Sequence, residues 1–352
     1  MAWKERTGSK NRSKVGAASV LALAAAIVVG AGFCAAWAES ASAPSLQERL
    51  ESATSGTVVN VAAGTFAGPL RVPPGVTVRG AGSGRTIIRA PANTKVTVAL
   101  SSGAKLEKVR VEGGQIGVES AGAANVRVSD AYVTSTGQTG LRLTDTTAEI
   151  RNAIIEGDKS EQMEGGISLS GGQVRVENSI VRGWDDGLIF DSDNPTRLWL
   201  TRCVLTENDD AVDLESTWAV ISHCSFARNR DDAVDVDGDS SCTVVACAIE
   251  DSRDDGIEIR LERKTYVDIR DCSISRSGED GIEVIDTPHS QGPFSNHVLI
   301  ERCRIGESAR YGIGLSDQKT EEANPAIRFP VRWRNVAFHA NKKGDVAPHK
   351  AE

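Results

Sequence analysis

The chain has 352 residues, of which 40 are Lys or Arg and 48 are Asp or Glu, so its formal net charge at pH 7 is -8. A surface of this kind disfavours nucleic acid and anionic membranes as partners, and it suits cations or polyanions that cations bridge. The seven cysteines do not by themselves indicate a disulfide framework, because that inference holds best for short exported chains with small cores.

The N-terminus has the pattern of a signal peptide. Basic residues lie between Lys4 and Lys14, an apolar run follows from Val15 to Phe33, and Ala36-Trp37-Ala38 has the small-x-small form that signal peptidase cuts. We therefore predict a signal peptide over residues 1–38 and a mature start near Glu39. The protein is then expected to be secreted, or to lie in the periplasm or cell envelope.

The apolar run is long for a cleaved signal, so an uncleaved anchor is the alternative. Cys34 follows Phe33, where a lipoprotein signal would have a small residue, and this speaks against a lipid anchor. Cleavage removes five basic residues and Glu5, so the formal charge of the remainder falls from -8 to -12. No other segment is long and apolar enough to span a bilayer, and we expect no membrane span after cleavage.

One short segment has helical periodicity, the stretch "SLQERLESA" from Ser45, which follows a short linker at 39–44. Ser45 can serve as an N-cap with Glu48 three residues on, and Leu46 and Leu50 fall on one face. We expect this helix to cover the open end of the first coil, because an unpaired strand edge invites aggregation.

The middle of the chain repeats with a period in the twenties. Strands rich in β-branched residues alternate with Gly, Asn, Asp and Ser turns, and a small residue precedes one strand of each repeat. A solenoid has this pattern. The leucine-rich repeat has the same period, but its leucine pattern L-x-x-L-x-L does not recur here. The fold class is therefore all-β: a right-handed parallel β-helix over 45–340 with a short N-terminal capping helix and a C-terminal tail at 341–352. The small residues are Gly117, Gly140, Gly166, Gly187, Ala211, Ala233, Gly256, Gly281 and Gly312.

Most of the cysteines occupy one position of this repeat, just after an alternating strand. Zinc ligation would need paired C-x-x-C spacing, which is absent, so we expect a buried stack of small side chains. Asn152 and Asn178 are assigned to the same position. The cysteines concerned are Cys203, Cys224, Cys247, Cys272 and Cys303.

Two stretches carry a resemblance to a known family. The opening "VVNVAAGTFAGPLRVPPGVTVRGAGSGRTIIRA" is similar to the usual first coils of the pectin-lyase-like right-handed β-helices, and "VENSIVRGWDDGLIF" resembles their repeat unit. The resemblance covers nearly all of the mature chain and implies the fold. It leaves function open, because this fold carries lyases, hydrolases, epimerases and structural proteins.

An acidic pattern recurs in four successive repeats: "NDDAVDLEST" at 208–217, "RDDAVDVDGD" at 230–239, "RDDGIEI" from Arg253 and "GEDGIEV" from Gly278. The aliphatic residues between the acids must fill the interior, so the strand carboxylates face outward. Strands stack about 4.8 Å apart, and each adjacent pair of charges then repels by roughly 0.9 kcal/mol in water and 3.5 kcal/mol at a dielectric of 20. The predicted external ladder is Asp213, Asp235, Glu258 and Glu283.

A divalent cation would relieve this repulsion. Calcium takes six to eight oxygen ligands from carboxylates and carbonyls, and paired acids also stand in each preceding turn. Two simpler roles compete: the second acid of each turn pair can accept backbone N–H bonds and fix the corner, and the strand carboxylates can form a solvated polar face. The Ca²⁺ ligands we predict are Asp209, Asp210, Asp213, Asp231, Asp232, Asp235 and Glu258.

The stretch from Asn208 to Leu214, N-D-D-A-V-D-L, resembles the calcium-binding strand N-x-D-D-G-F-D-L of family 9 polysaccharide lyases, with Ala and Val in place of Gly and Phe. The resemblance implies that calcium binds a uronate carboxylate and a lysine abstracts the neighbouring proton, which is sound chemistry for β-elimination. We predict Lys264 as the base, Arg260 and Arg263 as substrate-carboxylate clamps, and a monomer that acts on an acidic polysaccharide.

Two other functions remain open. A non-catalytic, calcium-stabilised β-helix would use the same acids without a base. A glycoside hydrolase would use two carboxyl groups, one of them protonated, from Asp209, Asp210, Asp231 and Asp232, but the G-H-G turn and R-I-K strand of polygalacturonases are absent. Two further features could contribute to a saccharide site: His289 in a long inter-strand insertion, and Trp184, Trp199 and Trp218 as stacking surfaces.

Overall fold

The computed structural model describes residues 44–134, 136–158, 164–288, 296–317 and 329–347. They belong to one unit that begins at Pro44. The predicted signal peptide, the cleavage site near Ala38 and His289 lie outside these residues. No helix of the described part is long and apolar enough to cross a membrane.

The predicted capping helix is present as α1 (Leu46–Glu51). The Ser45 hydroxyl accepts a 3.3 Å hydrogen bond from the N–H of Glu48, and the Ser45 N–H donates a 2.7 Å hydrogen bond to the Glu48 carboxylate. Leu46 and Leu50 are buried, and the Gln47 side chain accepts a 2.9 Å hydrogen bond from the N–H of Arg71. The helix is thereby fixed on the first coil, as the sequence predicts.

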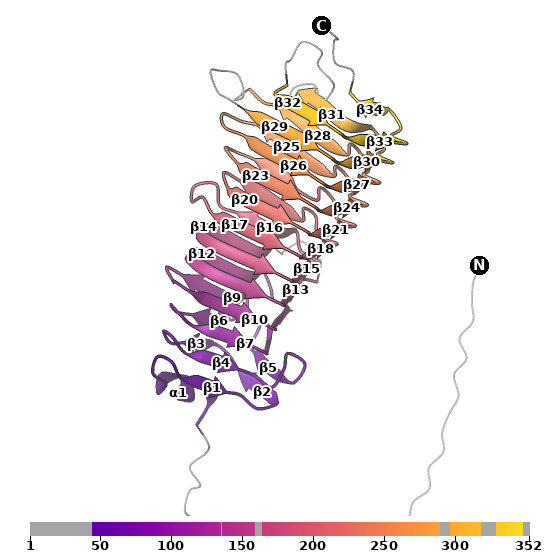
Figure 1. Ribbon diagram of the computed structural model, residues 1–352. Helices are drawn as coiled ribbons and strands as arrows, with labels where there is room; N and C mark the ends of the chain where they lie inside the picture. The colour runs from indigo at the N-terminus through magenta and orange to yellow at the C-terminus, as the bar shows by residue number, and fades with distance from the viewer. Residues whose placement is uncertain (1–43, 135, 159–163, 289–295, 318–328, 348–352) are drawn as a thin grey trace, which may run out of the picture. The chain divides into compact units, whose positions relative to one another are not determined.

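The strands stack in parallel in three columns, here called faces A, B and C (Figure 1). Faces A and B form one 22-stranded sheet, because β12 and β14 are long enough to contribute to both, and face C is a separate 12-stranded sheet. Every strand pairing is parallel and joins one coil to the next. The chain is a right-handed parallel β-helix, as the sequence pattern predicts.

Face A consists of β3 (Leu70–Val72), β6 (Val96–Leu100), β9 (Ile116–Ala121), β12 (Thr139–Arg151), β14 (Gly165–Glu177), β16 (Asp186–Phe190), β19 (Val212–Glu215), β22 (Asp235–Asp237), β25 (Ile257–Leu261), β28 (Ile282–Asp286), β31 (Tyr311–Asp317) and β34 (Gly344–Val346). Face B consists of β1 (Val58–Asn60), β4 (Thr77–Arg79), β7 (Lys105–Glu107), β10 (Val126–Ser129), the second halves of β12 and β14, β17 (Arg197–Thr201), β20 (Trp218–Ser222), β23 (Ser241–Val245), β26 (Tyr266–Arg270), β29 (His297–Glu301) and β32 (Val331–Arg334). Face C consists of β2 (Gly64–Ala67), β5 (Thr86–Arg89), β8 (Arg110–Glu112), β11 (Tyr132–Thr134), β13 (Ile154–Glu156), β15 (Ile180–Arg182), β18 (Val204–Thr206), β21 (Ser225–Ala227), β24 (Ala248–Glu250), β27 (Ser273–Ser275), β30 (Arg304–Gly306) and β33 (Ala337–His339).

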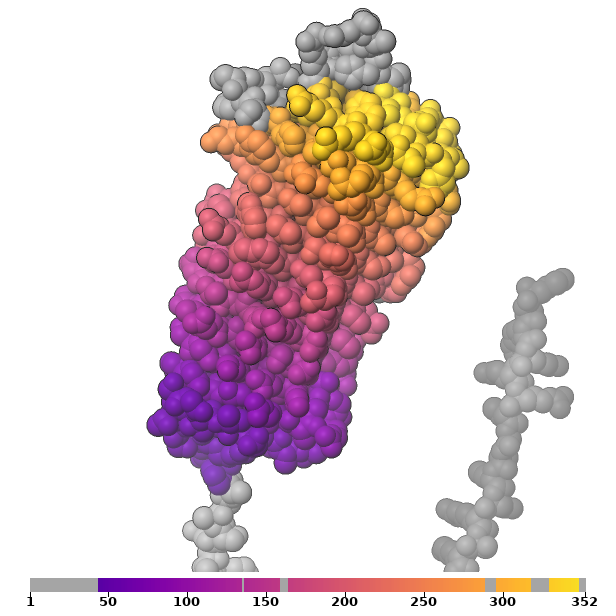
Figure 2. All heavy atoms as spheres, viewed as in Figure 1, coloured from indigo at the N-terminus to yellow at the C-terminus, as the bar shows by residue number. Residues whose placement is uncertain are grey.

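The interior is filled by aliphatic side chains that stack coil upon coil. On face C, from β5 to β30, one residue near the middle of each strand is fully buried and pairs with its counterpart in the next coil, as in Leu205, Phe226 and Ile249. Figure 2 shows the same order on the outside, where successive colours follow one another along the β-helix. Each coil therefore buries its apolar side against its two neighbours, as in other solenoids.

The predicted cysteine stack is present, with one correction to its register. Cys203, Cys224, Cys247, Cys272 and Cys303 are buried free thiols, and the Cys224 thiol, for example, donates a 3.6 Å hydrogen bond to the Leu200 carbonyl. Asn152 and Asn178, however, adopt φ of 50° like Arg202 at 54°, one residue before the cysteine position. Asparagine suits this left-handed conformation, and Ala153 and Ser179 are the residues that precede the cysteines in the stack.

The β-helix continues past the predicted boundary at 340. Strand β34 lies inside the segment that we predicted as a C-terminal tail, and its residues Gly344 and Val346 pair with Tyr311 and Ile313 of β31.

Candidate active site

The acid pattern forms a ladder on face A. Asp213 pairs with Asp235, Asp235 with Glu258, and Glu258 with Glu283, one residue from each of β19, β22, β25 and β28. The ladder ends at Gly314, the partner of Glu283 in β31, because a Cβ at Gly314 would collide with the Asp280 carboxylate. The predicted register of the four strand acids is confirmed.

These carboxyl groups are less exposed than the sequence predicts. Asp235, Glu258 and Glu283 are 8%, 8% and 7% exposed, and Asp213 is half-buried. They point away from the aliphatic core, but the acids of adjacent coils and two arginines cover them. A freely solvated polar face is therefore not what the structure shows.

The second acid of each turn pair fixes the corner of the coil. The Asp210 carboxylate accepts a 2.9 Å hydrogen bond from the N–H of Asp232, Asp232 accepts one of 2.7 Å from Asp255, and Asp255 accepts one of 2.6 Å from Asp280. Asp280 accepts the N–H of Tyr311 in the same way at 2.5 Å. The corner role that we considered for these residues is confirmed, and each uses one carboxylate oxygen.

Three arginines contact this acid face. Arg260 lies 3.2 Å from Asp235 Oδ2 and 2.9 Å from Asp237 Oδ2, and it also pairs with Glu258. Arg310 pairs with Glu279, and its Nη2 lies 3.9 Å from Glu283 Oε1. Arg230 is the third.

Arg230 belongs to the first part of the acid face. Its Nε lies 3.2 Å from Asp209 Oδ1, and its Nη2 donates a 3.2 Å hydrogen bond to the Trp184 carbonyl. The acid face carries more acids than these three arginines can neutralise. Its acids are Asp185, Asp186, Asp209, Asp210, Asp213, Asp231, Asp232, Asp235, Asp237, Asp254, Asp255, Glu258, Glu279, Asp280 and Glu283.

Burial and mutual repulsion favour the protonated form of the deeper acids. Burial raises the pKa of Asp232 to about 10, and the charges of Glu258 and Asp210 raise it further. The pKa of Asp235 rises to about 9 because of burial and the nearby Asp237. Burial also raises the pKa of Glu258 to about 8, against the opposing charge of Arg260.

A second group is closer to solvent and titrates closer to neutrality. Burial raises the pKa of Asp186 to about 8, of Asp210 to about 7 and of Asp213 to about 6, and neighbouring carboxylates contribute to each shift. Asp209, which is half-buried and paired with Arg230, and Asp231, which is exposed, lie beside Asp210. A carboxyl group whose pKa lies near neutrality, Asp210, therefore has other carboxyl groups beside it, and general acid–base chemistry needs such neighbouring groups. Our site prediction omitted Asp186, although the repeat marks it as a turn acid.

Open space lies in front of the C-terminal half of the acid face. A cleft of about 540 Å³ is lined by acids and by two arginines, Arg260 and Arg310. Lys264 and Arg263 are exposed in the turn between β25 and β26 and do not line this cleft. The Lys264 N–H donates a 3.1 Å hydrogen bond to Asp239 Oδ1, and the Arg263 guanidinium lies 3.6 Å from Asp239 Oδ2.

Among the residues that the structure describes, three groups of acids have carboxylate oxygens close enough to share a metal ion. In each group the oxygens lie within 4.8 Å of one another. In the group formed by Asp232, Asp235 and Glu258, Asp235 Oδ1 is buried and accepts no hydrogen bond. This all-oxygen set fits a hard cation such as Ca²⁺, with Arg260 as a competitor for the same charge. The groups are Asp231, Asp232 and Asp254; Asp232, Asp235 and Glu258; and Asp255, Glu258 and Glu283.

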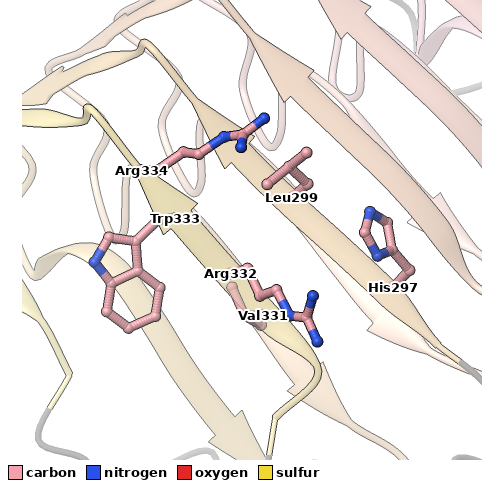
Figure 3. A pocket seen from close by; sticks show the side chains of 6 residues that line it. All are labelled: His297, Leu299, Val331, Arg332, Trp333 and Arg334. Carbon is pink, nitrogen blue, oxygen red and sulfur yellow. The ribbon is translucent and has the colours of Figure 1, made fainter.

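Another hollow lies at the end of face B, on β29 and β32 (Figure 3). It measures about 580 Å³, and its lining contains His297, Leu299 and Arg332 on one side of the strands with Trp333 pointing to the other. Its lining residues include no carboxylate, and the titratable side chain among them, His297, lies 3.3 Å from Asp268 Oδ1, so it offers one such contact where the acid face offers many neighbouring carboxyl groups. The acid face is therefore the candidate active site.

One of the predicted stacking residues is excluded. Trp184 is fully buried, and its indole N–H donates a 3.2 Å hydrogen bond to the Ile155 carbonyl. It is a core residue that cannot contact a sugar. Trp199 and Trp218 lie on face B, away from the ladder.

Solved structures share the fold. The catalytic domain of a GH87 alpha-1,3-glucanase in complex with nigerose superposes with a TM-score of 0.60 at 14% identity over 82% of this chain and 63% of that domain. The catalytic unit of a thermostable GH87 alpha-1,3-glucanase from Streptomyces thermodiastaticus strain HF3-3 gives 0.58 at 11% identity over 87% and 65%. A variant of the periplasmic alginate epimerase AlgG gives 0.51 at 11% identity over 84% and 83%. The chain thus spans less than two thirds of the length of the glucanases.

No curated protein matches the chain in sequence. A family model described as "Right handed beta helix region" matches residues 165–327, which include the whole acid ladder from Asp213 to Glu283. The part of the chain that carries the candidate site is therefore a right-handed β-helix region.

Proposed function

We propose that the protein cleaves glycosidic bonds in a polysaccharide by hydrolysis at the acid face. The observation that supports this best is the position of Asp210, a half-buried carboxyl group close to those of Asp209 in the same turn and Asp231 in the next coil. Two of the glucanase structures that share the fold carry a single aspartate-to-alanine substitution and are in complex with nigerose. An aspartate-based carbohydrate site on the same fold is consistent with the proposal.

The proposed chemistry uses one protonated carboxyl group and one carboxylate. Asp210 has one oxygen on the Asp232 N–H and the other available to hold a proton. It donates this proton to the glycosidic oxygen as the bond to C1 breaks. A water molecule attacks C1 and gives its proton to the carboxylate of Asp209 or Asp231, so that one water is added and a new reducing end forms.

The test is a panel of polysaccharides that includes α-1,3-glucan, polygalacturonate and alginate. Hydrolysis predicts new reducing ends without ultraviolet absorbance of an unsaturated product. Folded protein that releases no reducing ends from any of them would contradict the proposal for these substrates. Turnover in the presence of a chelator separates a metal-free reaction from a metal-dependent one.

Calcium-dependent β-elimination of a uronate polymer is the second candidate. It is favoured by the close carboxylate oxygens of Asp232, Asp235 and Glu258, which would hold the ion. Bound calcium would neutralise the uronate carboxylate and acidify the adjacent C–H. The predicted base Lys264 and clamp Arg263 do not line the cleft, and the guanidinium of Arg260 is already paired. Asp210 does not line this cleft either, so the preference for hydrolysis rests on the neighbouring carboxyl groups of Asp209, Asp210 and Asp231.

The assay also discriminates elimination and a non-catalytic role. An unsaturated product that needs calcium, and that Lys264→Ala abolishes, would establish the lyase. A protein that binds calcium and gains stability from it, but releases neither product, would be a structural or glycan-binding β-helix.

We also propose export. The basic and apolar pattern of residues 1–38 supports it, and one protein with the same fold is described as periplasmic. N-terminal sequencing of the protein from the envelope or the medium should give a start near Glu39. A start at Met1 in the cytoplasmic fraction alone would contradict this.

A further inference from the structure

Face B carries a pair of tryptophans next to unpaired arginines. The rings of Trp199 and Trp218 lie edge to face, with centroids 5.2 Å apart and an interplanar angle of 64°. The Arg175 guanidinium lies 4.1 Å from the centre of the Trp199 ring. Together with Arg197 the two tryptophans line a hollow of about 340 Å³.

The strand register brings these aromatic and cationic side chains together on face B. Arg175 of β14 pairs with Trp199 of β17, and Arg197 of β17 pairs with Trp218 of β20, so aromatic and cationic side chains alternate across three coils. Trp218 is 39% exposed.

The charges of the surface select for anions. In the described part of the chain neither Arg175 nor Arg197 forms an ion pair, whereas the acid face holds its arginines in several. The guanidinium of Arg175 stacks on a ring, which orients it and leaves the N–H groups at its edge free for a carboxylate or sulfate. The adjoining hollow of about 300 Å³ adds Lys105, and it also holds Arg127 paired with Glu149 at 2.6 Å.

The surface thus combines an apolar platform with oriented cations. Saccharide rings stack their apolar faces on indoles, and their carboxylate or sulfate groups pair with guanidinium groups. Single-stranded nucleic acid also stacks and pairs in this way, and the formal charge of -8 opposes both kinds of polyanion alike; a saccharide is favoured because it is the substrate class of the proposed function, on which this choice rests. We infer that Arg175, Trp199 and Trp218 form a binding site for an anionic saccharide chain, separate from the acid face.

Fluorescence and calorimetric titrations with polygalacturonate, alginate and heparin test the inference, with dextran as a neutral saccharide and oligo(dT) as the nucleic acid. Anionic saccharides should bind, and dextran should bind more weakly. Trp218→Ala should weaken binding by about tenfold or more, and Arg175→Gln should weaken binding of the anionic chains while removing most of their salt dependence. Trp218→Phe should retain much of the affinity.

Trp333→Ala is the matched control, because Trp333 is 42% exposed on a different surface. It should leave the affinity unchanged. The titrations are repeated with Asp210→Asn, a variant that prevents turnover. It should bind with the wild-type affinity, which distinguishes this site from the acid face. Equal losses with Trp218→Ala and Trp333→Ala, tighter binding of oligo(dT) than of every saccharide, or no saccharide binding by folded protein would each overturn the inference.

Discussion

The backbone N–H of Asp255 donates a 2.7 Å hydrogen bond to the side-chain Oδ1 of Asp232 in the coil before it. The Asp232 side chain is 5% exposed, so its second oxygen cannot be compensated by bulk water. The corner needs an acceptor and gains nothing from a negative charge. This separates the structural role of a buried acid from any chemical one.

Asp232→Asn should therefore preserve the corner, and Asp232→Ala should not. An asparagine oxygen can accept the same N–H, whereas alanine leaves a buried donor unpaired at a cost of roughly 1–3 kcal/mol. Urea unfolding of both variants at pH 8 measures the difference. Equal stability of the two variants would show that the hydrogen bond contributes nothing.

The protein should lose stability as pH rises above 4. The folded-state pKa values of Asp213, Asp210 and Glu258 are raised to about 6, 7 and 8, above the unfolded value of about 4. Between the two values the unfolded chain releases protons that the folded chain keeps, so the free energy of unfolding is highest at acidic pH and falls through these pKa values. Melting temperatures at pH 5, 7 and 9 should decrease in that order.

Asp235→Asn is the variant that isolates this effect. It removes an ionisable group whose pKa is raised to about 9, so it should flatten the fall in stability between pH 5 and 9. Asp251→Asn, at an exposed turn of face C where the Asp251 carboxylate pairs with Arg276, should leave the profile unchanged. A wild-type stability that rises from pH 5 to pH 9 would contradict the assigned shifts.

Much of the fold and part of the site follow from sequence. Alternation in segments such as Val212-Asp213-Leu214 settles which side chains enter the core, and the repeat then settles the register of Asp213 on Asp235. Burial could not be predicted, because it depends on Arg260 and Arg310 lying across the acids. These arginines come from different positions of the repeat, so no pattern signals their contacts.

Two predictions were wrong because a single sequence does not show a residue's backbone conformation or the direction of its side chain. The sequence pattern places Asn152 at the cysteine position, yet its φ of 50° shows that it lies one residue earlier. A backbone dihedral angle cannot be read from a single sequence. Trp184 sits beside the acid pattern and was grouped with the stacking residues, but its indole enters the interior of the coil. The role of Lys264 as a base stays a prediction, although Lys264 is exposed beside Asp239 and does not line the cleft.

Asp210→Asn should reduce hydrolysis by roughly 10²–10⁴-fold. Asparagine keeps the acceptor for the Asp232 N–H but cannot donate a proton, so the fold should be kept. Asp209→Asn and Asp231→Asn, assayed separately, identify which carboxylate activates water. The Lys264→Ala variant should retain activity, and a variant of Asp210 with undiminished release of reducing ends would remove it from the mechanism.

Calcium should stabilise the protein through the ladder. An ion bound only by the folded state at 100 times its Kd adds about 2.7 kcal/mol to the free energy of unfolding. The double variant Asp213→Ala with Asp235→Ala should lose this gain, since Asp235 belongs to one of the close oxygen groups. Melting curves with calcium and with a chelator measure it, and wild-type curves that coincide would remove the metal site.

Close packing between coils predicts a sharp contrast between two glycines of one turn. At Gly80 an added Cβ would lie 2.8 Å from both the Thr86 Cβ and the Val109 Cγ1, and the Gly80 N–H donates a 2.8 Å hydrogen bond to the Glu107 carbonyl of the next coil. Gly84 is exposed, and an added Cβ would meet no atom within 4 Å. Gly80→Ala should therefore cost about 1–3 kcal/mol through overpacking. Gly84→Ala should be neutral or stabilise by about 0.4–1 kcal/mol, because alanine restricts the unfolded chain. Urea unfolding of the two variants gives both values, and equal effects would show that the coils can separate locally without loss.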